Sequence, residues 1–260
     1  MKAPRQIILC ATQRCGSTIV VEDLRNTELL GMPQEAFIPW SPSREGVDFS
    51  ERLQRIQERD ATDNGVFSVK VMARQLPVIE KCLALSPMPV RDDVPDISDK
   101  VFPYVSSAFK DATFVWIRRR DTIRQAISRV MARQTGVNHA VGDKNDEHFA
   151  GKVLKGYSQK YNQNADYRQN AIRGAMKQIQ KEELVWQRFF RDWDIKPIMV
   201  DYEQYVDTWE EKVREIAAAV DVTLPTELKQ RKLVKLSNAV NDEWFRRYTD
   251  DVIAELSENI

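Results

Sequence analysis

A short polar loop near the N-terminus contains residues that are typical of an anion-binding site. The stretch ATQRCGST at 11–18 follows an apolar run and precedes a helix-like segment. Its spacing is similar to the phosphate-binding pattern Gly-x-x-x-x-Gly-Lys-[Ser/Thr], because Gly16 and Thr18 occupy the second glycine and hydroxyl positions. Ser17 stands at the lysine position. Backbone N–H groups at a helix N-terminus bind phosphate-like anions without a lysine, so the loop predicts an anion site.

A cation lies inside this loop rather than after its glycine, since Arg14 comes two residues before Gly16. The missing lysine reaches the β- and γ-phosphates in nucleotide hydrolases, so its absence disfavours triphosphate chemistry. It also removes one reason to expect magnesium. We therefore expect a shorter 5′ anionic group. The alternative is an ordinary strand–turn–helix corner that contains a glycine.

A second basic cluster lies at 118–120, where three arginines follow an apolar strand-like run over 113–117. A helix then opens at Asp121 and carries Ser128. The carboxyl end of a parallel strand faces the usual ligand crevice, and arginine forks suit phosphate oxygens. Beside the first loop, this cluster predicts a ligand with two separated anionic groups. The alternative is a solvated basic cluster in which Asp121 caps a helix.

A possible general base lies in the stretch GMPQEAFIPW at 31–40. Glu35 follows a Gly–Pro turn and has Phe37 and Trp40 beside it. A carboxylate in an aromatic-lined loop is able to deprotonate a hydroxyl nucleophile, and the tryptophan is able to stack on a sugar ring. The alternative is a surface glutamate beside a packed tryptophan.

These residues need a scaffold, and the apolar pattern predicts an α/β fold with a parallel sheet covered on both faces. Short apolar or β-branched runs predict strands, and helical spacing predicts helices between and after them. The expected strands are 6–11, 66–71, 113–117 and 196–200, and the expected helices are 17–30, 121–134, 158–193, 206–220 and 238–256.

Two stretches look irregular. Residues 86–98 carry three prolines and three aspartates, which predicts a loop. Residues 135–156 hold four of the nine glycines, which predicts a flexible lid or exchange arm. The pattern shows no internal repeat and no clear domain boundary, so a single domain over 1–260 is expected.

The totals exclude several classes of protein. The 260 residues are 42% hydrophobic and 30% charged with zero net charge, which indicates a folded soluble domain without a nucleic-acid partner. Apolar runs are too short for a transmembrane segment or a secretion signal. Three scattered cysteines suit a reducing compartment, so a cytoplasmic location is expected. With two histidines, a zinc site or a Ser-His-Asp triad is disfavoured.

Six stretches together resemble the bacterial trehalose 2-sulfotransferase family, a branch of the sulfotransferases that use 3′-phosphoadenosine 5′-phosphosulfate (PAPS). They are spread over most of the chain in the family's order. The stretches are QRCGST at 13–18, GMPQEAF at 31–37, VKVM at 69–72, RRRDTIRQAIS at 118–128 with ARQTG at 132–136, PIMVDYEQY at 197–205 and NDEWFRRY at 241–248.

The resemblance implies a three-layer, P-loop NTPase-like sulfotransferase fold. It implies in-line, metal-independent transfer of a sulfuryl group from PAPS to a hydroxyl of a carbohydrate acceptor, trehalose or a related sugar or glycolipid. Family members can form homodimers. In this reading Glu35 is the general base, and Gln34 and Trp40 contact the acceptor. The 5′-phosphosulfate is held by Gln13, Arg14, Cys15, Gly16, Ser17 and Thr18, with Arg14 as the main cation, and the 3′-phosphate by Arg119 and Ser128.

Some positions keep open roles or depart from the family. Cys15 replaces a common serine, which predicts a loop sensitive to alkylation. Further residues on matching motifs have no assigned role, namely Lys70, Gln134, Thr135, Arg246 and Arg247. Two other functions are compatible with the scaffold: a small-molecule kinase, which the serine at the lysine position argues against, and a non-catalytic nucleotide-binding protein.

Overall fold

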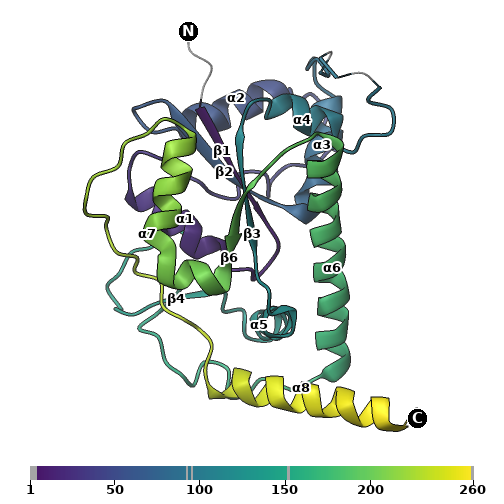
Figure 1. Ribbon diagram of the computed structural model, residues 1–260, viewed down its shortest axis with the longest axis vertical. Helices are drawn as coiled ribbons and strands as arrows, with labels where there is room; N and C mark the ends of the chain where they lie inside the picture. Colours follow the sequence, from purple (N-terminus) through teal and green to yellow (C-terminus); the bar gives the residue numbers. More distant parts are fainter. Residues whose placement is uncertain (1–4, 92, 95, 151–152, 259–260) are drawn as a thin grey trace. The chain divides into compact units, whose positions relative to one another are not determined.

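The computed structural model describes residues 5–91, 93–94, 96–150 and 153–258. Its main sheet has four parallel strands in the order β2-β1-β3-β6 (Figure 1). All four expected strands are confirmed, with ends that differ by one or two residues. The strands are β1 (Arg5–Ala11), β2 (Val66–Met72), β3 (Thr113–Arg118) and β6 (Ile198–Asp201).

Helices cover both faces of this sheet, so the predicted three-layer α/β fold is confirmed (Figure 1). Side chains of β1 alternate between the two layers: Ile8 and Cys10 join one core, whereas Ile7 and Leu9 join the other. The first core is covered by α2 (Phe49–Arg59), α3 (Leu76–Ala84), α4 (Pro103–Ala108) and the last turns of α6 (Gln169–Asp192), and the second by α1 (Ser17–Asn26) and α7 (Tyr202–Ala219).

The strand order places a topological switch point at β1. Its neighbours are β2 on one side and β3 on the other, so the chain leaves β1 in one direction and returns on the opposite side. Ligands of open parallel sheets bind in the crevice outside the carboxyl ends of the strands at such a point. The loop at 12–16 and Arg118, the last residue of β3, both lie at these carboxyl ends.

The helices show where the sequence pattern is less informative. The structure confirms α5 (Thr122–Thr135) and α8 (Ala239–Glu258). The expectation of a helix from 158 is wrong, because α6 begins at Gln169 and the preceding segment is built from turns. There the buried Asn162 amide donates to Asn238 and Asn241 side chains, which anchors a turn instead of a helix. The helices α2, α3 and α4 were not expected, nor was the short 3₁₀ helix η1 (Ala73–Gln75).

The chain forms two compact units. Unit 1 contains residues 1–118 and 182–230 and holds the main sheet; unit 2 contains 119–181 and 231–260. The core of unit 2 lies between α5, α8 and the first turns of α6, with Ile127, Ile172 and Trp244 buried. The division falls inside α6. A single functional domain over the whole chain stays a prediction.

The glycine-rich arm at 135–156 has some regular structure. It contains β4 (His139–Val141) and β5 (Val153–Lys155), which pair in parallel. Positions 151–152 lie outside the described residues, and the mobility of the arm stays a prediction. The described residues of 86–98 form no helix or strand, as predicted, with 92 and 95 outside the description.

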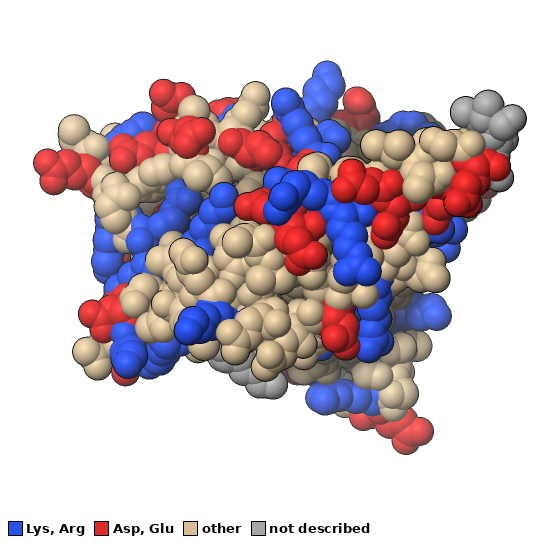
Figure 2. Space-filling view, turned by 90° about the horizontal axis from the view of Figure 1, so that it is seen from below, with Lys and Arg blue, Asp and Glu red and all other residues tan. Residues whose placement is uncertain are grey.

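The surface carries both signs of charge. On the face drawn in Figure 2, Lys and Arg side chains are intermixed with Asp and Glu side chains. This mixture agrees with 39 basic and 39 acidic residues in the chain. Within the described ranges, no helix has the length and apolar character that crossing a bilayer requires.

Candidate functional site

The loop between β1 and α1 has the backbone geometry of an anion-binding turn. Arg14 and Gly16 both adopt left-handed conformations, with φ of 68° and 95°. Gly16 is the N-cap of α1, and among the described residues no side chain caps this helix end. The first turn, which starts with the buried Ser17 and Thr18, has no acidic residue. The helix N-terminus therefore presents N–H groups and a positive dipole end toward the loop.

Gly16 is required for a second reason, its contact with α7. A Cβ atom built at this position would lie 2.2 Å from Cδ2 of Tyr202, the first residue of α7. Such a contact is far inside van der Waals distance, and the φ of 95° already disfavours any side chain. The Tyr202 ring therefore leaves no space for a side chain at position 16 and restricts the loop backbone there.

Glu35 is held by a lysine of the central sheet. Lys70 Nζ lies 2.9 Å from Glu35 Oε1, and the side chains are 8% and 26% exposed. Lys70 is paired in register with Leu9 of β1, two residues before that strand ends at Ala11. The Lys70 backbone N–H also donates to the carbonyl of Gln34 at 3.1 Å, so the 34–35 segment is fixed to β2 twice. The open role of Lys70 thus becomes a definite contact with the predicted base.

The other two predicted acceptor residues have structural contacts. The Gln34 amide donates to Asp60 Oδ1 at 2.7 Å. Trp40 is only 4% exposed, and its ring packs edge-on against Phe37 with a centroid distance of 4.9 Å. Trp40 therefore belongs to the core beneath the Glu35 segment in this structure, and its contact with a sugar stays a prediction.

Cys15 lies fully buried inside the loop. Burial raises the pKa of its thiol, and the nearby charge of Glu183 acts in the same direction, whereas hydrogen bonds involving Thr12 and Ser17 oppose them. A thiolate is the reactive species in alkylation, so burial and a raised pKa both slow the reaction. The expectation of an alkylation-sensitive loop is therefore not supported by this environment.

The predicted 3′-phosphate residues belong to unit 2. Arg119 directly follows β3, and its half-buried guanidinium has an Nε that solvent does not reach. Ser128 is half-buried on α5. The cap of that helix is confirmed, because Asp121 Oδ1 accepts from the Arg124 N–H at 2.8 Å. Binding of a phosphate by Arg119 and Ser128 stays a prediction.

The C-terminal motif at 241–248 serves packing in unit 2. Asp242 forms an ion pair with Arg124 of α5, whose guanidinium lies 4.4 Å from the Phe245 ring centroid. Arg247 lies over the Tyr167 ring at 4.1 Å, and Arg246 Nε donates to the carbonyl of Asp242. The two arginines with open roles thus have intramolecular contacts.

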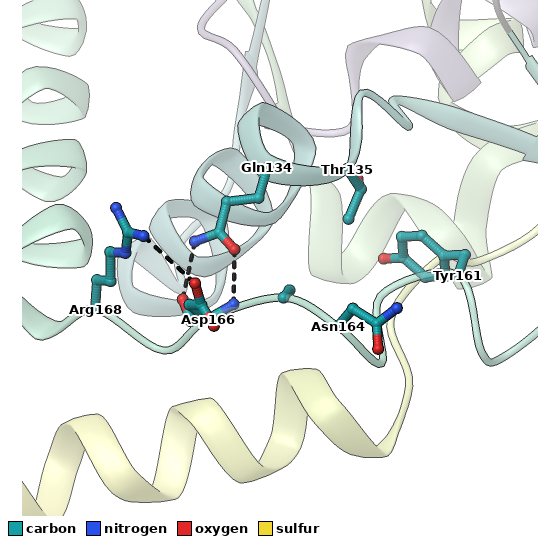
Figure 3. Close-up of a pocket in the computed structure, with 7 residues that line it drawn as sticks. Gln134, Thr135, Tyr161, Asn164, Asp166 and Arg168 are labelled. Carbon is teal, nitrogen blue, oxygen red and sulfur yellow. Dashed lines mark hydrogen bonds and ion pairs between the residues drawn. The ribbon is translucent and has the colours of Figure 1, made fainter.

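A polar cavity of about 410 Å³ lies in unit 2 at the end of α5 (Figure 3). Gln134 reaches across to the chain at Asp166: its amide nitrogen donates to the Asp166 carbonyl at 2.8 Å, and its amide oxygen accepts from the Asp166 N–H at 2.7 Å. Thr135 donates to the Met131 carbonyl and accepts from the Val137 N–H, which ends the helix. These contacts give Gln134 and Thr135 structural roles. The lining residues are Gln134, Thr135, Tyr161, Asn164, Ala165, Asp166 and Arg168.

Sequence reasoning missed one charged residue beside the loop. Glu183 of α6 accepts a hydrogen bond from Thr12 Oγ1 at 3.2 Å, and its second oxygen lies 3.8 Å from Arg118 Nε. Burial raises the pKa of Glu183 to about 7, although Arg118 and Thr12 act in the opposite direction. The available signal was its position one turn before the fully buried Trp186, which puts a carboxyl on the face of α6 that packs on the sheet.

Two sequence relatives are sulfotransferases. The chain is 27% identical, over an alignment 285 positions long, to the trehalose 2-sulfotransferase of Mycobacterium tuberculosis, strain ATCC 35801 / TMC 107 / Erdman. It is 25% identical, over an alignment 283 positions long, to the trehalose 2-sulfotransferase of Mycolicibacterium smegmatis. The alignments cover 95% of this chain and 95% and 96% of the two relatives. The sequence model of one family matches residues 6–251, and the chain belongs to that family, the Stf0 sulphotransferases.

Proposed function

We propose that this protein transfers a sulfuryl group from PAPS to a hydroxyl of trehalose or a related sugar. The family match over residues 6–251 carries this proposal, and two relatives named for trehalose support the acceptor class. The geometry of the β1–α1 loop supports an anionic donor. The proposal needs no metal, and it places the reaction at the carboxyl edge of β1 and β2.

The loop suits the 5′ end of the donor in three ways. Its helix end presents backbone N–H groups, Arg14 supplies a cation within the loop, and the first turn of α1 lacks acidic side chains. Fixed N–H dipoles and a guanidinium stabilise negative charge that develops on the bridging oxygen during transfer. Ser17 at the lysine position fits a ligand without a γ-phosphate. At the other end, the proposal assigns the 3′-phosphate to Arg119 and Ser128.

Glu35 is the base in this proposal. Lys70 binds Oε1 at 2.9 Å and fixes the orientation of the carboxylate, which leaves Oε2 to accept the proton of the acceptor hydroxyl. The deprotonated oxygen then attacks the sulfur in line with the departing nucleotide. Because a buried lysine already orients the carboxylate, the carboxylate loses less orientational freedom when the acceptor binds.

The decisive experiment replaces the base and measures binding and transfer separately. We expect Glu35→Gln to keep the affinity for 3′-phosphoadenosine 5′-phosphate within about twofold, because the donor loop is untouched. Transfer to trehalose should fall by about 10²–10⁴-fold, the usual contribution of a general base. Calorimetric titration and a radiolabelled transfer assay with a panel of sugars measure the two quantities.

The matched control is Glu45→Gln, because Glu45 is an exposed glutamate in the same segment between α1 and α2. This variant should transfer at the wild-type rate. Normal turnover by the Glu35 variant would remove the base from the proposal. Binding of ATP with magnesium in preference to 3′-phosphoadenosine 5′-phosphate would favour a kinase instead. Product binding without transfer to any sugar would favour a non-catalytic protein.

A further inference from the structure

One face of α6 holds the end of β1, where the loop starts. The Trp186 indole N–H donates to the carbonyl of Ala11, the last residue of β1, at 3.1 Å. One helical turn earlier, Glu183 Oε1 accepts from the hydroxyl of Thr12, the next residue of the chain. Side chains three positions apart on a helix share a face, so the two contacts act together. Glu183 is therefore positioned at the switch point of the sheet.

The ionised form of Glu183 is only partly compensated there. Its side chain is 18% exposed, and Arg118 Nε is 3.8 Å from Oε2, beyond hydrogen-bond distance. Within the described part of the chain, Oε2 has no hydrogen-bond partner. A buried carboxylate with one neutral hydrogen bond and one distant cation retains a desolvation cost. Protonation of Oε2 removes that cost and leaves Oε1 free to keep accepting from Thr12.

Groups on each packed element act on this carboxyl. Burial raises the pKa of Glu183 to about 7, and the charge of Glu182 on α6 acts in the same direction, whereas Arg118 of β3 and the hydroxyl of Thr12 lower it. Glu183 in turn acts on the loop, since its charge contributes to the raised pKa of Cys15. An anion in this loop therefore experiences the charge of Glu183 as well.

We propose that Glu183 is a positioning residue of the donor loop and takes up a proton from solvent when a phosphate or phosphosulfate group binds there. The proton binds Oε2, and no bond of the ligand is made or broken in this step. A negative ligand next to a carboxylate disfavours its charged form, so the protonated form is the one that accompanies the bound anion. This inference rests on the proposed function only in that the loop at 13–18 binds the donor.

The test measures proton uptake on binding. Wild-type protein and Glu183→Gln are titrated with 3′-phosphoadenosine 5′-phosphate by calorimetry at pH 7, in Pipes and in imidazole, whose ionisation heats differ. The ligand's own phosphates titrate too, so the difference between the two proteins is the measured quantity. We expect the wild type to take up about half a proton more than the variant, because a group with a pKa near 7 is half protonated before binding.

The pH dependence gives an independent readout. Between pH 7 and pH 8 the wild-type Kd should rise about fivefold more than the Kd of the variant, because the free carboxyl ionises over this range. The matched control is Glu80→Gln, since burial also raises the pKa of that carboxyl in unit 1. Glu80 caps α4 through the N–H groups of Tyr104 and Val105, and its variant should keep the wild-type proton uptake.

Thr12→Val keeps the proposal testable if the glutamine variant does not fold. Loss of the hydroxyl donor should raise the pKa of Glu183 further, so the weakening of binding should move to higher pH. Equal proton uptake in wild type and Glu183→Gln, or an unchanged pH dependence in the Thr12→Val protein, would overturn the role of Glu183. Lack of any nucleotide binding by the wild type would overturn the proposed function together with this inference.

Discussion

Cys15 lies in the candidate donor loop, but its thiol is held in an unreactive state. Its thiol is fully buried, and its environment suppresses the thiolate. In the proposed function the loop meets the anion with backbone N–H groups, so the identity of this side chain is free to vary as long as it fits inside. A small buried side chain meets that condition, which explains why a cysteine is compatible with the site.

The prediction at this scale concerns alkylation. We expect iodoacetamide at pH 7.5 to modify Cys15 at least about tenfold more slowly in the native protein than in guanidinium, because burial limits both access and ionisation. Because its pKa is raised, the rate should climb as the pH increases. Peptide mass spectrometry measures the modification at each cysteine. Equal rates in the native and denatured protein would show that the thiol is accessible.

At the scale of elements, the loop is shaped by two helices that start close to it. The helix α1 begins just after Gly16, a left-handed residue, and α7 begins at Tyr202, whose ring occupies the space above that glycine. The effect of the positive φ can be separated from the effect of the Tyr202 ring, because another glycine of unit 1 has a similar φ value but no atom near the position of an added Cβ. Gly65 has a φ of 77°, and a Cβ atom added there would have nothing within 4 Å.

The two glycines should respond differently to substitution by alanine. We expect Gly16→Ala to lower the free energy of unfolding by about 2–3 kcal/mol, since it adds a clash with Tyr202 to the cost of a positive φ. It should also weaken binding of 3′-phosphoadenosine 5′-phosphate at least about tenfold. Gly65→Ala should cost only about 1 kcal/mol and leave binding unchanged. Urea denaturation and calorimetry provide both numbers, and equal losses in the two variants would remove the role of the ring.

At the scale of the whole molecule, the proposed donor has two anionic ends, and they are assigned to different compact units. The 5′ end is assigned to the loop of unit 1 and the 3′-phosphate to Arg119 and Ser128 of unit 2. The chain passes directly from one unit to the other between Arg118 and Arg119. Comparing nucleotides with and without a 3′-phosphate therefore tests the contribution of unit 2.

We expect Arg119→Ala to weaken binding of 3′-phosphoadenosine 5′-phosphate by about 10–100-fold, the size of a lost charge-assisted hydrogen bond. Binding of adenosine 5′-monophosphate should change by less than about twofold. The matched control is Arg120→Ala, an exposed neighbour that should affect neither ligand. Calorimetric titration of both nucleotides measures the ratio. A similar loss for the two nucleotides would contradict the 3′-phosphate assignment.

The sequence pattern was sufficient for the four strands of the main sheet and insufficient for the short strands β4 and β5 and for several helices. Strands of a parallel sheet are buried on both faces, so their apolar runs are visible directly, as at 113–117. The helix α4 has only six residues, so it has no long apolar period. The helix α2 carries Phe49, Leu53 and Ile56 at helical spacing, and this signal within a strongly charged stretch was overlooked. The late start of α6 depends on a buried amide network around Asn162, which links residues far apart in the chain.

The candidate site shows the same difference between features encoded locally and features that depend on packing. Local motifs singled out the loop and Glu35 as candidates, because their residues are neighbours in sequence. The partners Lys70 and Glu183 depend on strand register and helix packing, which motif spacing does not encode. The sequence left two positions open for Trp40, since an aromatic residue near a polar motif fits a binding surface and a core equally well, and the structure places it in the core.

The burial of all three cysteines has a practical consequence for spectroscopy. Cys10, Cys15 and Cys82 are free thiols inside the protein, and burial raises the pKa of each. A single cysteine introduced at an exposed position would therefore be the preferred site for a thiol-directed spin label or fluorophore, without removal of the native ones. Labels placed at Lys144 in the glycine-rich arm and at Glu45 would report distances between the arm and unit 1, before and after a nucleotide binds.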